Sequence, residues 1–247
     1  MHVACPPMQV SIGPGRPSPY RRGMTSAPQN PPLRAAIVPV TPLQQNCSIV
    51  WCTATMKAAV VDPGGDLPRI HDAIAKTGVT VEKILLTHGH IDHAGGAKEL
   101  ADALSVPVEG PQEEDRFWLA RLDEDGQAYG IPAQVLEPTR WLSEGDTVTI
   151  GDLTLDVYET PGHTRGHVIF HHAPSHFALV GDVLFQGSVG RSDLPGGDHD
   201  TLIRSIVEKL WPLGNETAFI PGHGQPSTFG HERQSNAFVA DRVLGLG

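Results

Sequence analysis

Three histidines and an aspartate lie within six residues of one another, immediately after an apolar run that is typical of a buried strand. The segment, residues 87–93, has the sequence THGHIDH. In an extended or turning backbone alternate residues point the same way, so His88 and His90 can face one position while Asp92 and His93 diverge. Imidazole and carboxylate groups are common protein ligands of transition metals. The segment therefore predicts a metal centre at the end of a strand.

Three more residues of ligand type follow apolar stretches and have glycine neighbours, namely His163, Asp182 and His223. With the four in 87–93 they give seven ligands, enough for two metals. Two metals about 3.5–4 Å apart need a bridging group, and a carboxylate bridges better than an imidazole, so we predict that Asp182 bridges. We expect the first metal to bind His88, His90, His163 and Asp182, and the second to bind Asp92, His93, His223 and Asp182.

The donor atoms of this set are nitrogen and oxygen, without a thiolate. Such ligands suit zinc first and then iron or manganese. The predicted cofactors are therefore two divalent metal ions, with zinc as the expected one. A lone histidine is more often a surface or core residue than a ligand, but that explanation does not account for a dense cluster with flanking glycines.

Two residues outside the set are candidates for supporting it. His167 lies four residues after His163 and can hydrogen-bond to a ligand. Asp62 ends an apolar run and precedes Pro-Gly-Gly. Its carboxylate either accepts the free N–H of a ligand imidazole or simply begins a turn, and the sequence favours neither.

From residue 35 onward, short β-branched and apolar runs alternate with segments of helical spacing. Strands are predicted at 35–40, 47–53, 57–61, 82–87, 147–150, 153–159, 167–171, 177–181 and 217–220. Helices are predicted at 66–77, from Asp92 to about 104, at 113–120 and at 198–210. Two groups of strands, each with helices, predict one α/β domain over 34–247 with two sheets inside and helices outside. Phe117 and Trp118 either pack in the core or form a wall of the substrate cleft.

The first 33 residues differ in composition from the rest. They hold eight of the 22 prolines and no acidic residue. We therefore predict that residues 1–33 form a disordered, proline-rich extension. A transit peptide is less consistent with this composition, because the prolines would interrupt the amphipathic helix that such peptides form.

Charge and cysteine content exclude several classes of function. A formal net charge of −10 argues against a nucleic-acid partner, because binding to phosphates needs a basic surface. No apolar run reaches membrane-spanning length, so no membrane partner is expected.

The three cysteines include no Cys-x-x-Cys pair. We expect Cys47 and Cys52 to be buried free thiols in a strand, which fits a reducing, cytoplasmic location.

The motifs resemble those of a known superfamily. In order, THGHIDH at 87–93, PGHT at 161–164, GD at 181–182 and PGHG at 221–224 are similar to the metal-binding motifs of the metallo-β-lactamase superfamily. IVPV at 37–40, QNC at 45–47, VDPGG at 61–65, GRSD at 190–193 and ERxxN at 232–236 are similar to glyoxalase II type hydroxyacylglutathione hydrolases, especially the compact single-domain bacterial form. The resemblance covers about 35–240 and implies an αββα four-layer sandwich.

The resemblance also implies an activity, that of a metal-dependent hydrolase which converts S-lactoylglutathione to glutathione and D-lactate. A hydroxide that bridges the two metals would attack the thioester carbonyl, with Asp92 and Asp182 as catalytic residues that hold and orient it. A thiolate leaves without a proton from a general acid, which favours a thioester over an amide. The expected partner is a small-molecule glutathione conjugate, and the chain fits a monomer or a dimer.

Arg191, in GRSD, is the candidate for substrate binding. Glyoxalase II enzymes carry a basic residue at the matching place, which implies contact with a carboxylate of glutathione. The alternative is an ion pair with Asp193 or Asp198.

Three other functions fit the same motifs. Persulfide dioxygenases share the implied fold and a similar Gly-Arg-Ser/Thr-Asp stretch, but use one iron on residues that match His88, His163 and Asp182. A lactonase would act on a cyclic ester with the same metals. A non-catalytic metal- or glutathione-binding module ranks last, because it would not need a complete bridging set.

Overall fold

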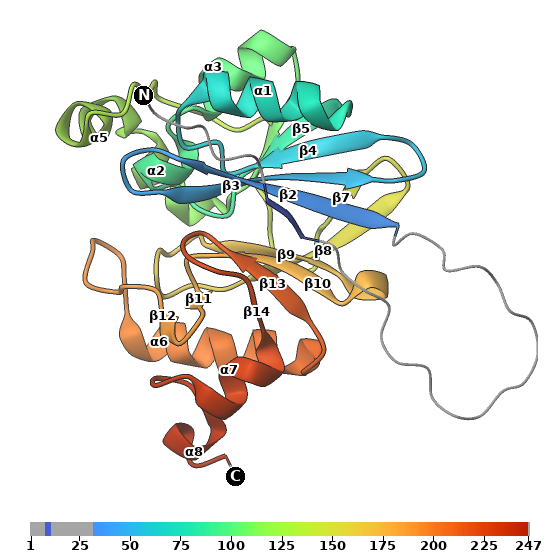
Figure 1. The fold of residues 1–247 in the computed structure, drawn as a ribbon. Helices are drawn as coiled ribbons and strands as arrows, with labels where there is room; N and C mark the ends of the chain where they lie inside the picture. The colour runs from blue at the N-terminus through green and yellow to red at the C-terminus, as the bar shows by residue number, and fades with distance from the viewer. Residues whose placement is uncertain (1–7, 11–31, 247) are drawn as a thin grey trace, which may run out of the picture.

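Two six-stranded sheets lie face to face in the middle of the molecule (Figure 1). The computed structural model describes residues 8–10 and 32–246. The first sheet has, in order of adjacency, β1 (Met8–Val10), β2 (Leu33–Val40), β3 (Gln45–Cys52), β4 (Lys57–Val61), β5 (Thr80–Leu85) and β6 (Val108–Glu109). The second has β14 (Ser227–Thr228), β13 (Ala218–Pro221), β10 (Phe177–Gly181), β9 (Val168–His172), β8 (Leu153–Glu159) and β7 (Thr147–Ile150).

Helices cover the outer side of each sheet, so the molecule has four layers (Figure 1). On the side of the first sheet are α1 (Leu67–Thr77), α2 (Ile91–Ala94), α3 (Ala97–Leu104), α4 (Arg116–Leu119) and α5 (Leu122–Tyr129), with the 3-10 turn η1 (Glu113–Asp115) before α4. On the side of the second are α6 (His199–Ser205), its π-helical continuation η3 (Ile206–Leu210), α7 (Phe229–Ser235) and α8 (Asp241–Leu244). A small hairpin joins β11 (Leu184–Phe185) to β12 (Ser188–Val189).

The alternation of side chains along the strands fills three buried layers. In β2, Ala36 and Val38 pack toward the helices of the first side, while Ala35 and Ile37 pack between the sheets. A third layer lies between the second sheet and its helices. Because both faces of β3 are covered, all of its residues are buried, which explains its nearly continuous apolar run. The predicted αββα sandwich of one domain is confirmed.

The helix predicted from Asp92 to about 104 is in fact two helices. α2 ends and α3 begins at Gly95-Gly96, where the Gly96 N–H donates to the carbonyl of Pro63. A Cβ atom on Gly95 would lie 2.7 Å from the carbonyl oxygen of Gly64. The break therefore comes from close packing against the loop after β4, which local helical spacing does not reveal. By contrast, α1 ends as predicted at Gly78, whose φ of 69° is left-handed.

Most of the predicted N-terminal extension lies outside the described residues. Within it, Met8–Val10 forms β1 and pairs antiparallel with Ala35–Ile37 of β2, which differs from the disorder predicted for those three residues. The edge of β2 offers unpaired backbone groups, and a short segment without proline can satisfy them. Leu33, at its end, is the buried first residue of β2, and for residues 1–7 and 11–31 the prediction stays a prediction.

Cys47 and Cys52 are buried free thiols of β3, as predicted, whereas Cys5 lies outside the described residues. Across the part of the chain that the structure describes, no helix is both long and apolar enough to cross a membrane.

One buried amide joins the two sheets at the edge where β3 begins. The Asn46 backbone N–H donates to the Gly222 carbonyl at 2.7 Å. Its side-chain Nδ2 donates to the carbonyl of Pro221 at 3.0 Å and to that of Gly224 at 2.9 Å. Asn46 thus fixes the loop after β13 against the start of β3.

Asn46→Asp should destabilise the fold. The substitution keeps the shape but replaces the donor with an oxygen that faces two carbonyl oxygens, so the free energy of unfolding should fall by about 1–3 kcal/mol. Urea denaturation followed by circular dichroism measures the change. Asn215→Asp is the matched control, because Asn215 is exposed and its Oδ1 accepts from Arg233 in a way that a carboxylate can keep. Equal stability of both variants would contradict the assignment.

Candidate metal centre

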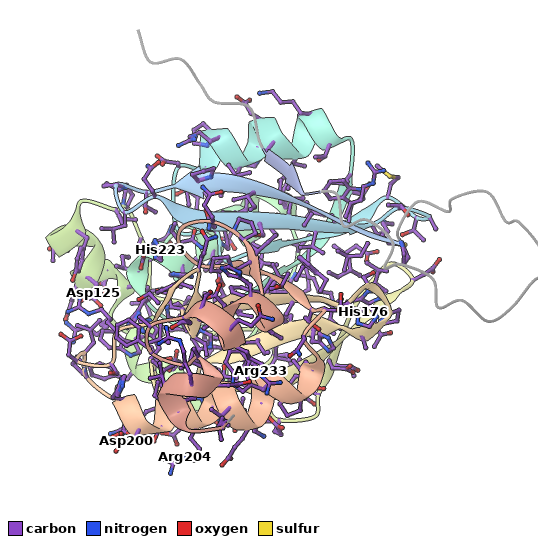
Figure 2. The ribbon with its side chains drawn as sticks, turned by 60° about the horizontal axis from the view of Figure 1, so that its bottom comes forward. Asp125, His176, Asp200, Arg204, His223 and Arg233 are labelled. Atoms are coloured by element: carbon purple, nitrogen blue, oxygen red, sulfur yellow. The ribbon has the colours of Figure 1, made fainter. Side chains whose placement is uncertain are left out.

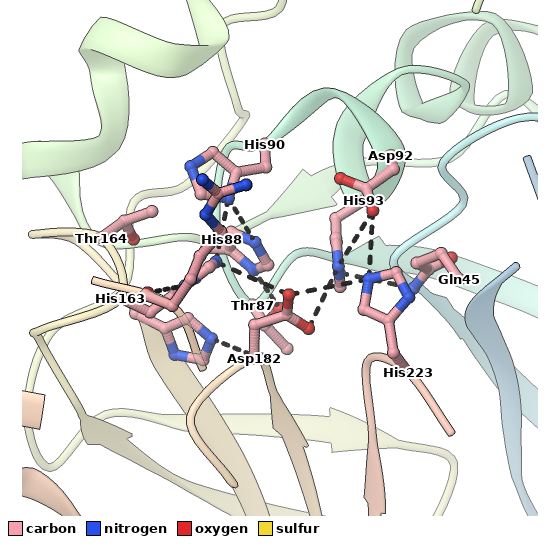
Figure 3. Close-up of polar contacts among 12 residues, drawn as sticks. Gln45, Thr87, His88, His90, Asp92, His93, His163, Thr164, Asp182 and His223 are labelled. Atoms are coloured by element: carbon pink, nitrogen blue, oxygen red, sulfur yellow. Dashed lines mark hydrogen bonds and ion pairs between the residues drawn. The ribbon is translucent and has the colours of Figure 1, made fainter. Parts of the chain in front are cut away.

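All seven predicted ligands lie at one edge of the sandwich, on loops and the short helix α2 near the ends of strands from both sheets (Figure 3). His88 and His90 follow β5, Asp92 and His93 lie in α2, His163 lies between β8 and β9, Asp182 follows β10, and His223 follows β13. Six of the seven are buried, and His223 is half-buried. The chain thus brings together side chains that are far apart in the sequence.

The first predicted set is held closely around one point. His90 Nδ1 lies 3.1 Å from His88 Nε2 and 2.9 Å from His163 Nε2. Nitrogen ligands about 2.0–2.1 Å from a tetrahedral zinc lie about 3.3–3.4 Å from one another. These three imidazoles therefore have nearly the spacing that one metal ion requires, with His90 offering Nδ1 and the other two offering Nε2.

The second predicted set lies beside the first. Asp92 Oδ2 is 3.1 Å from His223 Nε2 and 3.9 Å from His93 Nε2. These two distances lie on either side of the spacing of about 3.3–3.4 Å expected between ligands of one ion.

Asp182 lies between the two sets (Figure 3). Its Oδ2 is 3.6 Å from His163 Nε2 in the first set and 3.6 Å from His223 Nε2 in the second. Its Oδ1 is 3.3 Å from His93 Nε2. One carboxylate thus approaches both sets, which is the geometry that a bridging ligand needs.

Burial sets the protonation of the ligands. Burial, together with His93 and His90, lowers the pKa of His88 well below its usual value, and burial beside His163 lowers the pKa of His90 to about 3. Burial raises the pKa of Asp182, but His93 more than offsets this and holds that pKa below its usual value. Neutral imidazole and ionised carboxylate are the forms that bind metal.

His93 differs, because Asp182 and Asp92 outweigh burial and raise its pKa, so metal binding there displaces a proton. Two buried atoms in the centre, His93 Nε2 and Asp182 Oδ1, lie 3.3 Å apart and have no hydrogen-bond partner elsewhere among the described residues. Buried polar atoms are rarely unpaired unless an ion or water meets them. The residues present therefore fit a site for two metal ions.

Asp62 orients two of the ligands. Its carboxylate accepts hydrogen bonds from the Thr87 N–H at 2.8 Å and from Thr87 Oγ1 at 2.6 Å, and its Oδ2 lies 2.9 Å from His93 Nδ1. An Nδ1–H donated to Asp62 leaves His93 Nε2 free to face the centre. Thr87 Oγ1 in turn lies 3.0 Å from His88 Nδ1. Asp62 therefore acts as a support and not merely as a turn residue.

Two further contacts hold predicted ligands through atoms that do not face the centre. His163 Nδ1 lies 2.7 Å from the Arg191 carbonyl oxygen, and the Asp182 N–H donates to His167 Nε2 at 3.1 Å. His167 therefore supports the loop that carries Asp182, as its position in the sequence suggested. Position 222 has room only for glycine, because a Cβ there would lie 2.0 Å from Asp182 Oδ1.

The centre forms the floor of a cavity of about 540 Å³, a size that suits a small-molecule ligand. The walls are mainly apolar, and the lining residues include Leu43, Trp118, Tyr129, Phe185 and Leu194. His223 and Asp125, which also line the cavity, lie at the same end of the molecule in Figure 2, whereas His176 lies at the other end. Trp118 is thus a cleft wall, while Phe117 is 52% exposed and faces a separate small cavity.

Arg191 lines the cavity but already has a partner. Its Nε and Nη2 donate to the two carboxylate oxygens of Asp193 at 2.8 and 2.9 Å. Both side chains are largely exposed, so water weakens this ion pair. The predicted alternative partner Asp193 is therefore present, and the cavity position of Arg191 is present as well.

A family model, a relative of similar sequence and solved structures of similar fold all match this chain over most of its length. The model of the metallo-beta-lactamase superfamily matches residues 40–223. The hydroxyacylglutathione hydrolase GloC of Haemophilus influenzae is 41% identical over 84% of this chain and 98% of its own. Among solved structures, the BLEG-1 B3 metallo-beta-lactamase has a TM-score of 0.76 and 35% identity, covering 83% of this chain and 99% of that one. TTHA1623, crystallised in a di-iron-bound form, has a TM-score of 0.74 and 35% identity, covering 82% of this chain and 98% of that one.

The position of Asp182 between the two sets predicts how its replacement affects metal content. Asp182→Ala should weaken the binding of both metals, so that the metal content falls below one ion per chain. His223→Ala should empty chiefly the second site and leave about one ion per chain. Elemental analysis after dialysis measures both. Asp200→Ala, on the exposed first turn of α6, is the control and should keep about two. Two metals retained by Asp182→Ala would show that Asp182 does not bridge.

Proposed function

Because the chain belongs to the metallo-beta-lactamase superfamily, we propose that it hydrolyses hydroxyacylglutathione thioesters such as S-lactoylglutathione, releasing glutathione and D-lactate. The enzyme is a metal-dependent hydrolase. The observation that carries the proposal is the Asp182 carboxylate, which approaches both ligand sets at the floor of a cavity large enough for a glutathione conjugate.

We assign His88, His90, His163 and Asp182 to one metal, and Asp92, His93, His223 and Asp182 to the other. Zinc is the expected metal for this nitrogen and oxygen set, with iron or manganese as alternatives, and TTHA1623 was crystallised with two irons. When bound, such metals supply Lewis acidity and lower the pKa of a coordinated water.

The protein groups have separate tasks in this reaction. Asp92 faces the cavity and can accept a hydrogen bond from the attacking water, which orients the water toward the substrate carbonyl. Asp62 keeps His93 Nε2 directed at the centre through the contact at 2.9 Å. Trp118 and Phe185 line the cavity, and each shields one side of the reacting group from bulk water.

The lining of the cavity favours a leaving group that needs no proton. Among the described residues that line it, the ionisable groups outside the ligand set are Asp125, Tyr129 and Arg191. Asp125 accepts a hydrogen bond from Arg121, and Arg191 is paired with Asp193. An amide nitrogen must be protonated to leave, whereas a thiolate is stable without a proton. The cavity thus suits a thioester better than an amide.

Hydrolysis of S-lactoylglutathione by the metal-loaded protein is the direct test. We expect the thioester absorbance to decay with loaded protein, to stop after treatment with a chelator and to return on addition of zinc or manganese. A β-lactam, a lactone and glutathione persulfide with an oxygen electrode are the competing substrates. Faster turnover of any of these three than of the thioester would overturn the proposal.

We also propose that Arg191 meets a carboxylate of the substrate, in competition with Asp193. Arg191→Ala should raise KM for S-lactoylglutathione about tenfold with a smaller effect on kcat, because the contact is similar in the ground and transition states. Asp193→Asn should act in the opposite direction and lower KM, since it frees the guanidinium.

An uncharged N-acetylcysteamine thioester should respond to neither change, and Arg204→Ala on α6 is the matched surface control. If Arg191→Ala leaves KM unchanged and lowers the melting temperature instead, Arg191 has a structural role.

A further inference from the structure

One buried carboxylate outside the ligand set links three segments around the first metal site. Asp115 is fully buried in η1. Its Oδ2 accepts from the Gly89 N–H at 2.9 Å and from Thr164 Oγ1 at 2.8 Å, and its Oδ1 accepts from the Gly166 N–H at 2.7 Å. Three donors from two loops thus converge on one side chain.

These two loops carry the ligands of the first site. Gly89 lies between His88 and His90, and Thr164 directly follows His163. Figure 3 shows Thr164 on the side of the centre occupied by these three histidines. The loops come from different sheets, so the hydrogen bonds to Asp115 set the distance of His163 from the other two.

The same segment also fixes a ligand ring and the cleft wall. The ring of His90 packs edge-to-face on Trp118 with centroids 4.5 Å apart. A Cβ on Gly89 would lie 2.7 Å from the Cβ of Trp118, so the glycine permits this close approach. The segment from Asp115 to Trp118 therefore packs directly against the loop of the first ligands.

The charge of Asp115 has no cationic partner among the described residues, and burial raises its pKa to about 6 against the effect of its hydrogen bonds. Burying a carboxylate without a cation is unfavourable, and the three donors compensate only in part. A neutral amide would fill the same space, but it cannot accept all three hydrogen bonds.

We propose that Asp115 is a positioning residue for the first metal, which holds the 88–90 and 163–166 loops at the spacing that His88, His90 and His163 need. The proposal rests on the two-metal assignment above. Asp92, His93 and His223 contact none of the donors to Asp115, and His93 is oriented by Asp62 instead. The role of Asp115 is therefore confined to one of the two sites.

The test measures metal affinity in proteins that keep a single site. His223→Ala retains the first site and His90→Ala retains the second. Asp115→Asn is added to each, and zinc affinity is measured by competition with a chromophoric chelator. In the His223→Ala background Asp115→Asn should weaken zinc binding about 10- to 100-fold, the usual effect of removing a residue that orients ligands. In the His90→Ala background the affinity should not change.

Glu232→Gln is the matched control in both backgrounds. Glu232 is also fully buried and accepts from the Gly187 N–H, Ser227 Oγ and Asn236 Nδ2, but it contacts neither ligand loop. Loss of a buried carboxylate as such would affect both variants alike. Zinc affinity of the first site should therefore fall with Asp115→Asn and not with Glu232→Gln.

Thr164→Val gives a milder variant should Asp115→Asn fail to fold, because it removes one of the three donors while keeping the shape. It should weaken the first site in the same direction. Unchanged affinity in the first site, or an equal loss in both sites, overturns the role of Asp115. If His223→Ala alone binds no zinc, the ligand assignment fails instead, so the two failures are distinct.

Discussion

The structure depends on ionised carboxylates and closely packed imidazoles gathered at the floor of one cavity. Asp182 keeps its charge although burial raises its pKa, because His93, whose Nε2 lies 3.3 Å away, together with His163 and His223 lowers that pKa. Such an arrangement is unfavourable without cations, since charges removed from water need a partner. Divalent metals would supply that partner. The neutral state of His88 and His90 then leaves their lone pairs available.

The sandwich meets this need by bringing strand ends from both sheets to one edge. β10 and β13 are almost entirely buried and β5 is buried at its C-terminal end, so the short loops that follow these strands start from fixed points. Hydrogen bonds donated by Asn46 and accepted by Asp62 and Asp115 then cross between segments and hold these loops in register. The precision of the centre therefore comes from contacts around the ligands as much as from the ligands themselves.

That the seven candidate ligands come together was predictable, because each stands in a short motif after an apolar run. His88 and His90 stand two apart after an apolar run, and Asp182 was the natural bridge once seven ligands were counted. Asp115 was not predictable, since its acidic neighbours Glu113 and Glu114 resemble a solvated helical turn and its donors lie 26 to 51 residues away. The break between α2 and α3 was missed for the same reason, because its cause is the packing of the loop at Pro63. Local pattern does not encode such distant contacts.

The origin of the ligands in both sheets has a consequence for synthesis of the chain. The residues at 88–93 leave the ribosome long before those at 163–223, and each predicted set draws on both stretches. A half-made chain therefore cannot assemble either set. Metal that binds only the completed arrangement stabilises the docking of one sheet on the other, by mass action. The second set could be completed only after His223 has emerged, so metal bound there would hold together two parts of the polypeptide that are made at different times.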